Sequence, residues 1–541
     1  MTGQQDVLAG AGFGSRIAEE ELDHLRSYFV ETEQWRKLLS GEVDIVFGAK
    51  GAGKSALYSL LVEKEPELRL GRRTVFIRAE NPRGATAFRD LITIPPLSEE
   101  SLRALWKLYF LATAAHYLRH HLTASKTSNA NAAQVIEVLS ANGLLAQNHT
   151  LVSRLKAVYE YIWKYIPSIE TTVEDPHSGY KYTGKITLAE PTSEQHGLGY
   201  RSLDALLETL NLAFRQVSIT VWLVLDRLDV AFADSDILEG NALRALFRTY
   251  LDMLGLSHIK VKIFLRDDIW RKIVANGFRE ASHITRTLTL SWTSQSLLNL
   301  IVRRLTVNEA LCAYYGVTKD EILATVELQN EFFYKVFPTQ IDIGASKPKT
   351  LEWMLSRTAD GSKRTAPREL IHLLVAARDE QLKMYELGNS EPEAFALFTN
   401  SAIRSALPIV SKARYDQTLC AENPSLKPYL ERLERKKAQQ SLDSLALLWN
   451  CSVDESSKTA EKLVEAGFFE RRGTRLSPVY WVPMLYRAGK RKGQRRLVTD
   501  ELGQAEDIVE RVGEGEDAHS QGRQRRTDCQ IRRYLGAPGL R

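Results

Sequence analysis

The feature that most constrains this chain is a glycine-rich segment between an expected strand and an expected helix. Residues 48–55 read Gly-Ala-Lys-Gly-Ala-Gly-Lys-Ser, which fits the pattern GxxxxGK[ST]. Residues 43–47 before it form a short apolar, β-branched run that is typical of a buried parallel strand. Residues 54–65 after it predict a helix. A strand, a glycine turn and a helix in this order predict a loop that binds phosphate groups.

Each part of this segment suits a nucleotide. Glycines adopt backbone conformations that other residues avoid and let the backbone approach a phosphate. Loop N–H groups and the helix start attract the anion, Lys54 would reach the β- and γ-phosphates, and Ser55 would ligate Mg²⁺. The alternative is a glycine turn that binds nothing. We therefore expect ATP and Mg²⁺ as cofactors, with nucleotide-binding positions Gly48, Ala49, Lys50, Gly51, Ala52, Gly53, Lys54, Ser55 and Ala56.

A hydrophobic strand that ends in a carboxylate should accompany such a loop. Residues 219–225 form that strand, and Asp226 follows it. A carboxylate there can hold Mg²⁺ through its water shell, although Asp226 could instead only cap the next turn. No glutamate stands next to Asp226, so Asp229 is the nearest candidate for a catalytic residue that orients water. A solvated turn carboxylate is the alternative for Asp229.

Three arginines are further candidates. Arg266 ends the expected strand at residues 259–265, where it can face the γ-phosphate and stabilise developing charge. Its alternative is an ion pair with a neighbouring aspartate. Arg364 and Arg368 flank Pro367, which is a natural residue at a helix start. Either could reach the phosphates, or both could be surface arginines.

Composition and charge limit the classes of protein to which this chain could belong. The chain has 541 residues, enough for three or four domains at roughly 150 residues each. Its 72 Lys and Arg against 67 Asp and Glu make it mildly basic, which does not by itself require nucleic acid. The four cysteines have neither metal-ligand spacing nor the pattern of a disulfide framework. With no signal-like start and no apolar run of about 18 residues, we expect a cytoplasmic protein outside the membrane.

The organisation of the chain predicts an α/β fold. Strands at residues 43–47, 74–78, 219–225, 259–265 and 285–290 alternate with helices, as in a parallel sheet. We expect helix over residues 17–39, an all-helical region from residue 293, and two short helices with a hairpin near residues 442–482, as in a winged helix. The expected parts are an N-terminal helical segment (1–40), a core (41–292) with an insertion at about 123–197, a helical lid (293–436), a winged-helix-like module (437–487) and a charged, disordered tail (488–541) with a basic cluster at 490–496.

Four segments together resemble a family of bacterial P-loop ATPases. They are Phe29-Val-Glu-Thr32, residues 48–55, Leu225-Asp-Arg-Leu-Asp229 and Ile263-Phe-Leu-Arg-Asp267. The family is related to the AAA+, origin-recognition and STAND branches, and the resemblance spans residues 17 to about 486. It implies an ASCE-type sheet in which the Asp226 strand lies between the second strand and the neighbour of the loop strand. It also implies a helical lid, with residues 366–371 as the lid motif, and often a winged helix.

The resemblance implies a nucleotide switch, and relatives of this kind serve in antiviral defence, among other roles. The missing acidic neighbour of Asp226 departs from the family pattern and argues against fast hydrolysis. The first hypothesis is an Mg²⁺-dependent ATPase that acts as a switch or motor, with a homo-oligomer plausible. One alternative is a regulator or initiator that binds duplex DNA and uses ATP as a structural ligand. Another is a scaffold that recruits a separately encoded effector protein.

Overall fold

The structure is a computed structural model in two compact units. It describes residues 3–15, 20–63, 73–79, 98–145, 151–165, 186–187, 193, 201–228, 236–388, 392, 395–474 and 477–487. Unit 1 comprises Met1–Phe333 and Thr365–Val375, and unit 2 comprises Tyr334–Arg364 and Ala376–Arg541. The chain therefore passes from unit 2 back into unit 1 for one short segment that includes Pro367 and Arg368.

Unit 1 is built on a five-stranded parallel sheet with strand order β2-β5-β6-β1-β7. The Asp226 strand, β5, lies between β2 and β6, and β6 is the neighbour of the loop strand β1. This order confirms the prediction of an α/β sheet of the ASCE type. The strands are β1 (Ile45–Gly48), β2 (Arg73–Arg78), β5 (Ile219–Leu225), β6 (Ile259–Arg266) and β7 (Thr287–Thr289).

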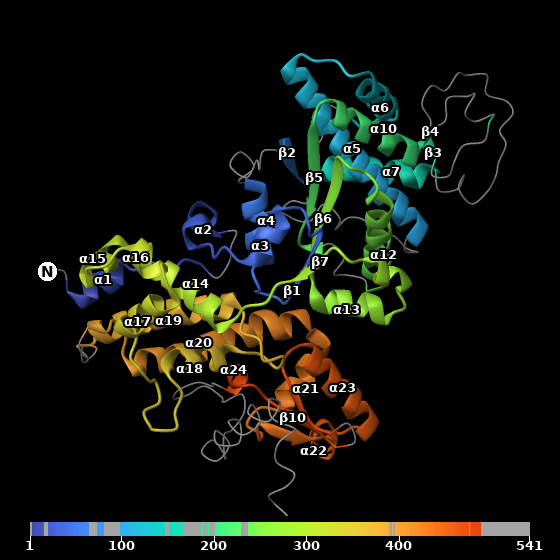
Figure 1. Cartoon of the computed structure of the whole chain (residues 1–541). Helices are drawn as coiled ribbons and strands as arrows, with labels where there is room; N and C mark the ends of the chain where they lie inside the picture. Colours follow the sequence, from blue (N-terminus) through green and yellow to red (C-terminus); the bar gives the residue numbers. More distant parts are fainter. Residues whose placement is uncertain are drawn as a thin grey trace, which may run out of the picture. The chain divides into compact units, whose positions relative to one another are not determined.

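Helices cover both faces of this sheet (Figure 1). Successive side chains of a strand point to opposite faces. Ile45 and Phe47 accordingly join the apolar core under α5, α10 and α12, whereas Val46 joins the core under α4 on the other face. The central strands β5 and β6 are mostly apolar because both of their faces are covered, with Lys260 and Lys262 of β6 as exceptions. The covering helices are α4 (Lys54–Glu63), α5 (Glu99–Ser125), α10 (Leu203–Gln216) and α12 (Asp236–Met253).

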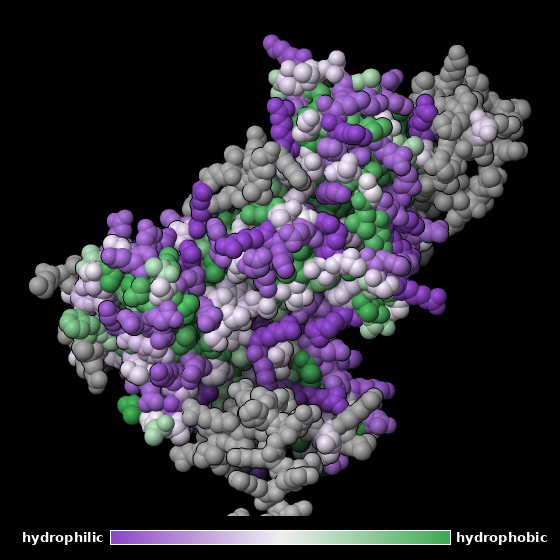
Figure 2. Space-filling view, viewed as in Figure 1, coloured by the Kyte–Doolittle hydropathy of each residue, from purple (hydrophilic) through white to green (hydrophobic). Residues whose placement is uncertain are grey.

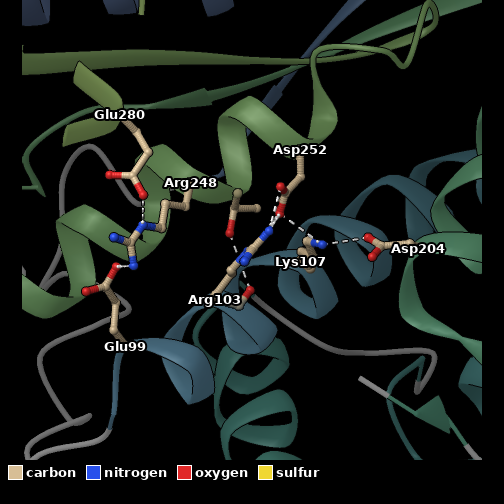
Figure 3. A network of polar contacts seen from close by, with 8 residues as sticks. Glu99, Arg103, Lys107, Asp204, Arg248, Asp252 and Glu280 are labelled. Carbon is tan, nitrogen blue, oxygen red and sulfur yellow. Dashed lines mark hydrogen bonds and ion pairs between the residues drawn. The ribbon is translucent and has the colours of Figure 1, made fainter. Parts of the chain in front are cut away.

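A network of ion pairs joins the helices on the α5 side of the sheet (Figure 3). Arg103 of α5 forms a two-pronged ion pair with Asp252 of α12, with N···O distances of 2.8 and 2.6 Å. Lys107 lies 2.6 Å from Asp204 of α10 and 2.9 Å from Asp252. The network fixes three helices relative to each other and lies outside the predicted nucleotide site.

The prediction of helix over residues 17–39 was wrong in its middle. The structure has two helices there, α2 (Leu22–Tyr28) and α3 (Glu33–Leu39). Thr32 begins α3, because its hydroxyl accepts a hydrogen bond from the backbone N–H of Trp35 at 3.2 Å, and Phe29 is extended. Threonine is a favoured N-cap residue. The sequence pattern did not reveal this break, because apolar residues recur at helical spacing on both sides of it.

Unit 1 has further helices and short strands besides the main sheet and the helices that cover it. The expected insertion contains α6 and α7, and its residues 146–150, 166–185, 188–192 and 194–197 lie outside the described part, as do residues 488–541. The elements are α1 (Gln4–Gly10), α6 (Ala130–Ala141), α7 (Leu151–Tyr165), β3 (Ile186–Thr187), β4 (Arg201–Ser202), α13 (Asp267–Ala275), η3 (Arg279–His283), α14 (Ser294–Thr306), α15 (Glu309–Tyr315), α16 (Lys319–Leu323) and α17 (Val326–Val336), whose last residues belong to unit 2.

Unit 2 combines helices with a small winged-helix module. Its three-stranded sheet has the order β8-β10-β9, and both pairings are antiparallel. The two short helices and the hairpin were predicted, whereas β8 was missed because it is only three residues of polar sequence. The elements are α18 (Thr350–Thr358), α19 (Pro367–Glu386, which begins in unit 1), α20 (Asn400–Arg414), η4 (Tyr415–Cys420), η5 (Pro424–Leu426), α21 (Lys427–Arg432), β8 (Gln439–Ser441), α22 (Leu442–Trp449), α23 (Val453–Glu465), β9 (Glu470–Gly473), β10 (Pro478–Trp481) and α24 (Met484–Arg487).

Among the described residues, no helix has both the length and the apolar character to span a bilayer. The face seen in Figure 2 is mostly hydrophilic, with hydrophobic residues in small separate groups. Scattered groups of this kind are normal on a protein surface and need no special explanation.

Candidate nucleotide-binding site

The glycine-rich loop turns from β1 into α4 through two left-handed residues. Gly51 has φ of +80° and Gly53 has φ of +98°, conformations that cost glycine little and other residues much. A turn closes where the N–H of Ala52 donates to the carbonyl of Ala49 at 3.1 Å. The loop therefore ends at the amino terminus of α4, where the first backbone N–H groups have no acceptor within the helix and attract anions.

Lys54 lies back across this loop. Its ammonium group donates to the carbonyl of Gly48 at 2.8 Å and to that of Ala49 at 3.0 Å. Both oxygens belong to neutral peptide groups. A polyphosphate offers the ammonium charged oxygens, which add a Coulombic attraction that a neutral carbonyl lacks. The lysine can therefore exchange these carbonyls for phosphate oxygens.

The carboxyl ends of β1, β5 and β6 meet at one edge of the sheet. Gly48 is the register partner of Arg266, so the arginine follows its strand beside the start of the loop. Asp226 directly follows β5, and only 4% of its surface is exposed. The structure thus brings Asp226, Arg266 and the loop to the same edge, as parallel strands require.

Arg266 forms the ion pair that was its alternative role. Its guanidinium donates to both carboxylate oxygens of Asp268, at 3.0 and 2.7 Å. Burial alone would raise the pKa of Asp268, but the Arg266 guanidinium and the backbone N–H groups of Asp268 and Ile269 together hold that pKa below its ordinary value. This pair uses Nε and Nη2 of Arg266, so a γ-phosphate contact would come from Nη1 or from exchange of the Asp268 partner.

The chain turns sharply after Asp226. Arg227 has φ of +58°, a left-handed conformation that is uncommon for a residue with a side chain. Such strain is often found next to functional residues. Asp229, the predicted water-orienting residue, lies outside the described residues.

The segment around Pro367 packs on the loop. A Cβ added to Gly51 would lie 3.0 Å from the Cβ of Arg368 and 3.4 Å from that of Ala366. Arg368 therefore lies against the glycine-rich loop, and its role as a lid residue stays a prediction. Arg364 is exposed and belongs to unit 2, so its role stays a prediction.

Two residues at the loop were missed by sequence reasoning. The indole N–H of Trp292 donates to the carbonyl of Ala52 at 2.9 Å. Leu290 packs at the start of the loop, where a Cβ added to Gly48 would lie 3.2 Å from the Cβ of Leu290. Both follow β7, which pairs with β1. The available signal was an aromatic residue just after the last strand, and only the strand order shows that this strand is next to β1.

Comparisons with known proteins leave the family open. No family model matches the chain, and no curated protein does so. Two solved structures of the Aeropyrum pernix ORC2 protein resemble it at 13% identity, each covering 87% of this chain and 90% of the other. One holds ADPNP–ADP complexes and gives a TM-score of 0.35, and the other is the ADP form and gives 0.29. Scores this low carry no argument about function, so the fold rests on the strand order of the chain itself.

Proposed function

We propose that this chain is an Mg²⁺-dependent ATPase that binds ATP at residues 48–56 and acts as a nucleotide-driven switch. The observation that carries the proposal is the loop itself. Gly51 and Gly53 turn the chain into the amino end of α4, and Lys54 lies across the loop on neutral carbonyls. Converging N–H groups with an adjacent, exchangeable cation are what a polyphosphate requires.

The residues present also suit magnesium. Mg²⁺ prefers oxygen ligands and keeps several waters, and Ser55 in the first turn of α4 and the carboxylate of Asp226 both offer oxygen. When bound, the ion would neutralise charge on the transferred phosphoryl group. Ser55 and Asp226 would hold it, while Lys54 would hold the β- and γ-phosphates.

The other candidates take roles around the γ-phosphate. Arg266 would exchange Asp268 for the phosphate and so report its presence. Arg368 would contact the nucleotide from its place against Gly51. Asp229 and Arg364 remain proposals for the water-orienting and second lid positions. Without an acidic neighbour to Asp226, turnover should be slow.

The segment at residues 360–369 supports a switch. In unit 2, the N–H of Gly361 donates to the carbonyl of Gly467 at 2.8 Å, and a Cβ on Gly361 would lie 2.3 Å from the carbonyl oxygen of Phe469. In unit 1, Ala366 and Arg368 pack on Gly51. A few residues of continuous chain therefore join the phosphate loop to the winged-helix module. A nucleotide that moves Arg368 would pull on this segment, an ordinary route for a two-state transition.

The DNA-binding alternative draws little support from the winged helix. The exposed residues of α23 include more carboxylates than lysines, with Asp454, Glu455 and Glu465 against Lys458 and Lys462. A helix that enters a DNA groove needs net positive charge near the phosphates. The basic cluster at residues 490–496 lies outside the described residues, so it neither adds nor removes support.

Steady-state ATP turnover tests the proposal. We expect Lys54→Ala to reduce turnover by about 100-fold or more, since it removes a cation from the transferred phosphate. Lys37→Ala, an exposed lysine of α3, is the matched control and should behave as wild type. Equal turnover in wild type and Lys54→Ala would contradict the proposal. Turnover that rises only with duplex DNA would favour the DNA-binding alternative.

A further inference from the structure

Trp292 is placed over the phosphate loop by two neighbouring elements. β7 pairs in parallel with β1, and its continuation is tied on by the N–H of Leu290, which donates to the carbonyl of Phe47 at 2.7 Å. Thr293 then caps α14, since its hydroxyl accepts from the N–H of Ser296 at 3.1 Å. A strand end and a helix cap on either side leave the backbone of Trp292 little freedom.

The ring of Trp292 is also held. It packs with Val375 against a small apolar cluster formed by Val30, Leu300 and Ile371. From this position the indole N–H donates to the carbonyl of Ala52 at 2.9 Å. A tryptophan that buries its ring usually finds a partner for its N–H. Here that partner is a backbone group inside the phosphate loop.

This hydrogen bond sets the direction of a peptide group. In a planar trans peptide the C=O of one residue and the N–H of the next point in opposite directions. When Trp292 holds the C=O of Ala52, it therefore turns the N–H of Gly53 away from the indole. Gly53 itself has φ of +98°, a region where glycine is conformationally permissive. Without an external tether, the Ala52–Gly53 peptide could rotate more freely than one between bulkier residues.

We propose that Trp292 is a positioning residue that aims the N–H of Gly53 at the bound polyphosphate. The inference rests on the proposed function, because it assigns a task within the same loop. Trp292 acts on the phosphates through the peptide between Ala52 and Gly53. It sets how tightly the triphosphate part binds, independently of the base.

Trp292→Phe tests this role, because it keeps an aromatic ring and removes the N–H. Trp106→Phe is the matched control: the indole of Trp106 donates to the carbonyl of Ala242 at 2.9 Å, within unit 1 but on α5. Isothermal titration with Mg²⁺ would measure the affinity for ATP and for inorganic tripolyphosphate. Tripolyphosphate has no base, so it separates loop geometry from contacts of the ring with the nucleobase.

We expect Trp292→Phe to weaken both ligands by about two- to tenfold, the range of one net hydrogen bond, while Trp106→Phe binds both as wild type does. Weaker ATP binding with unchanged tripolyphosphate binding would overturn the inference and place the ring against the base. Unchanged binding of both ligands would also overturn it, while the proposed function would stand if Lys54→Ala still abolishes binding. No ATP binding by wild type would contradict the proposed function itself.

A second measurement on the wild-type protein covers the case in which Trp292→Phe does not fold. The exchange of the Trp292 indole proton with solvent reports the hydrogen bond directly by NMR. We expect tripolyphosphate to slow this exchange, because a phosphate on the Gly53 N–H fixes the same peptide. An exchange rate that tripolyphosphate leaves unchanged would contradict the role.

Discussion

The two ends of β1 differ in how the charged side chains near them are paired. At the amino end, Asp44 accepts from Lys262 at 2.7 Å, from Arg286 at 2.5 Å and from the hydroxyl of Tyr250 at 3.1 Å. At the carboxyl end, the ammonium of Lys54 donates to neutral carbonyls. The charge of Asp44 is paired within the protein, whereas the carbonyl partners of Lys54 could be replaced by the phosphate oxygens of a ligand. We call the amino end of β1, where Asp44 and Lys262 lie, the fixed end, and the carboxyl end, where the glycine-rich loop begins, the binding end.

Two charged side chains of the fixed end are deeply buried. Lys262 and Asp44 have side chains that are only 1% and 4% exposed, and the Lys262 ammonium lies 3.9 Å from the centre of the Trp222 ring. Burial lowers the pKa of Lys262 to about 8, although Asp44 works in the other direction. Burial and the neighbouring Asp44 together raise the pKa of Tyr250. The cluster is a structural element, and its loss should show as lost stability.

The largest effect is expected at the fixed end. Asp44→Ala leaves the buried ammonium of Lys262 without its carboxylate and should lower the free energy of unfolding by about 3–5 kcal/mol. Urea denaturation of the full chain, followed by tryptophan fluorescence, would measure it. Glu160→Ala is the matched control, because it breaks a pair with Lys156 in which both side chains are mostly exposed. That control should cost less than about 1 kcal/mol, and equal losses in the two variants would refute the contrast.

A smaller effect is expected from pH. The pKa of Lys262 is about 8 in the folded protein and 10.5 ordinarily, so between these values the unfolded chain binds more protons. Stability therefore rises with pH across that window. We expect wild type to gain at least about 1 kcal/mol over Lys262→Met between pH 8 and pH 10.5. Since other titrating groups are common to both proteins, a constant difference between them would show that Lys262 titrates normally.

Much of the sheet was predictable because strands and loop chemistry are local. The apolar runs gave all five strands of the main sheet, and the GxxxxGK[ST] pattern gave the loop between β1 and α4. The resemblance to P-loop ATPases added the strand order, which periodicity alone does not determine. Two local features were missed. Thr32 divides a helix that looks continuous in the sequence, and β8 is too short and polar to be recognised as a strand.

The rest of the site depends on contacts that are distant in sequence. Trp292 reaches Ala52 only because β7 pairs with β1. The close approach of Gly361 to Phe469 has no signature in the sequence at all. Each is a matter of three-dimensional packing, which spacing along the chain does not encode.

The most direct test of the account is hydrogen–deuterium exchange with and without ATP and Mg²⁺, followed by peptide mass spectrometry. We predict slower exchange at residues 48–57, altered exchange at residues 361–370 and 467–469, and no change at the fixed end, residues 259–263. Lys54→Ala should show none of these changes. ATP binding that protects the loop but leaves residues 361–370 and 467–469 unchanged would contradict the claim that the loop drives the winged-helix module.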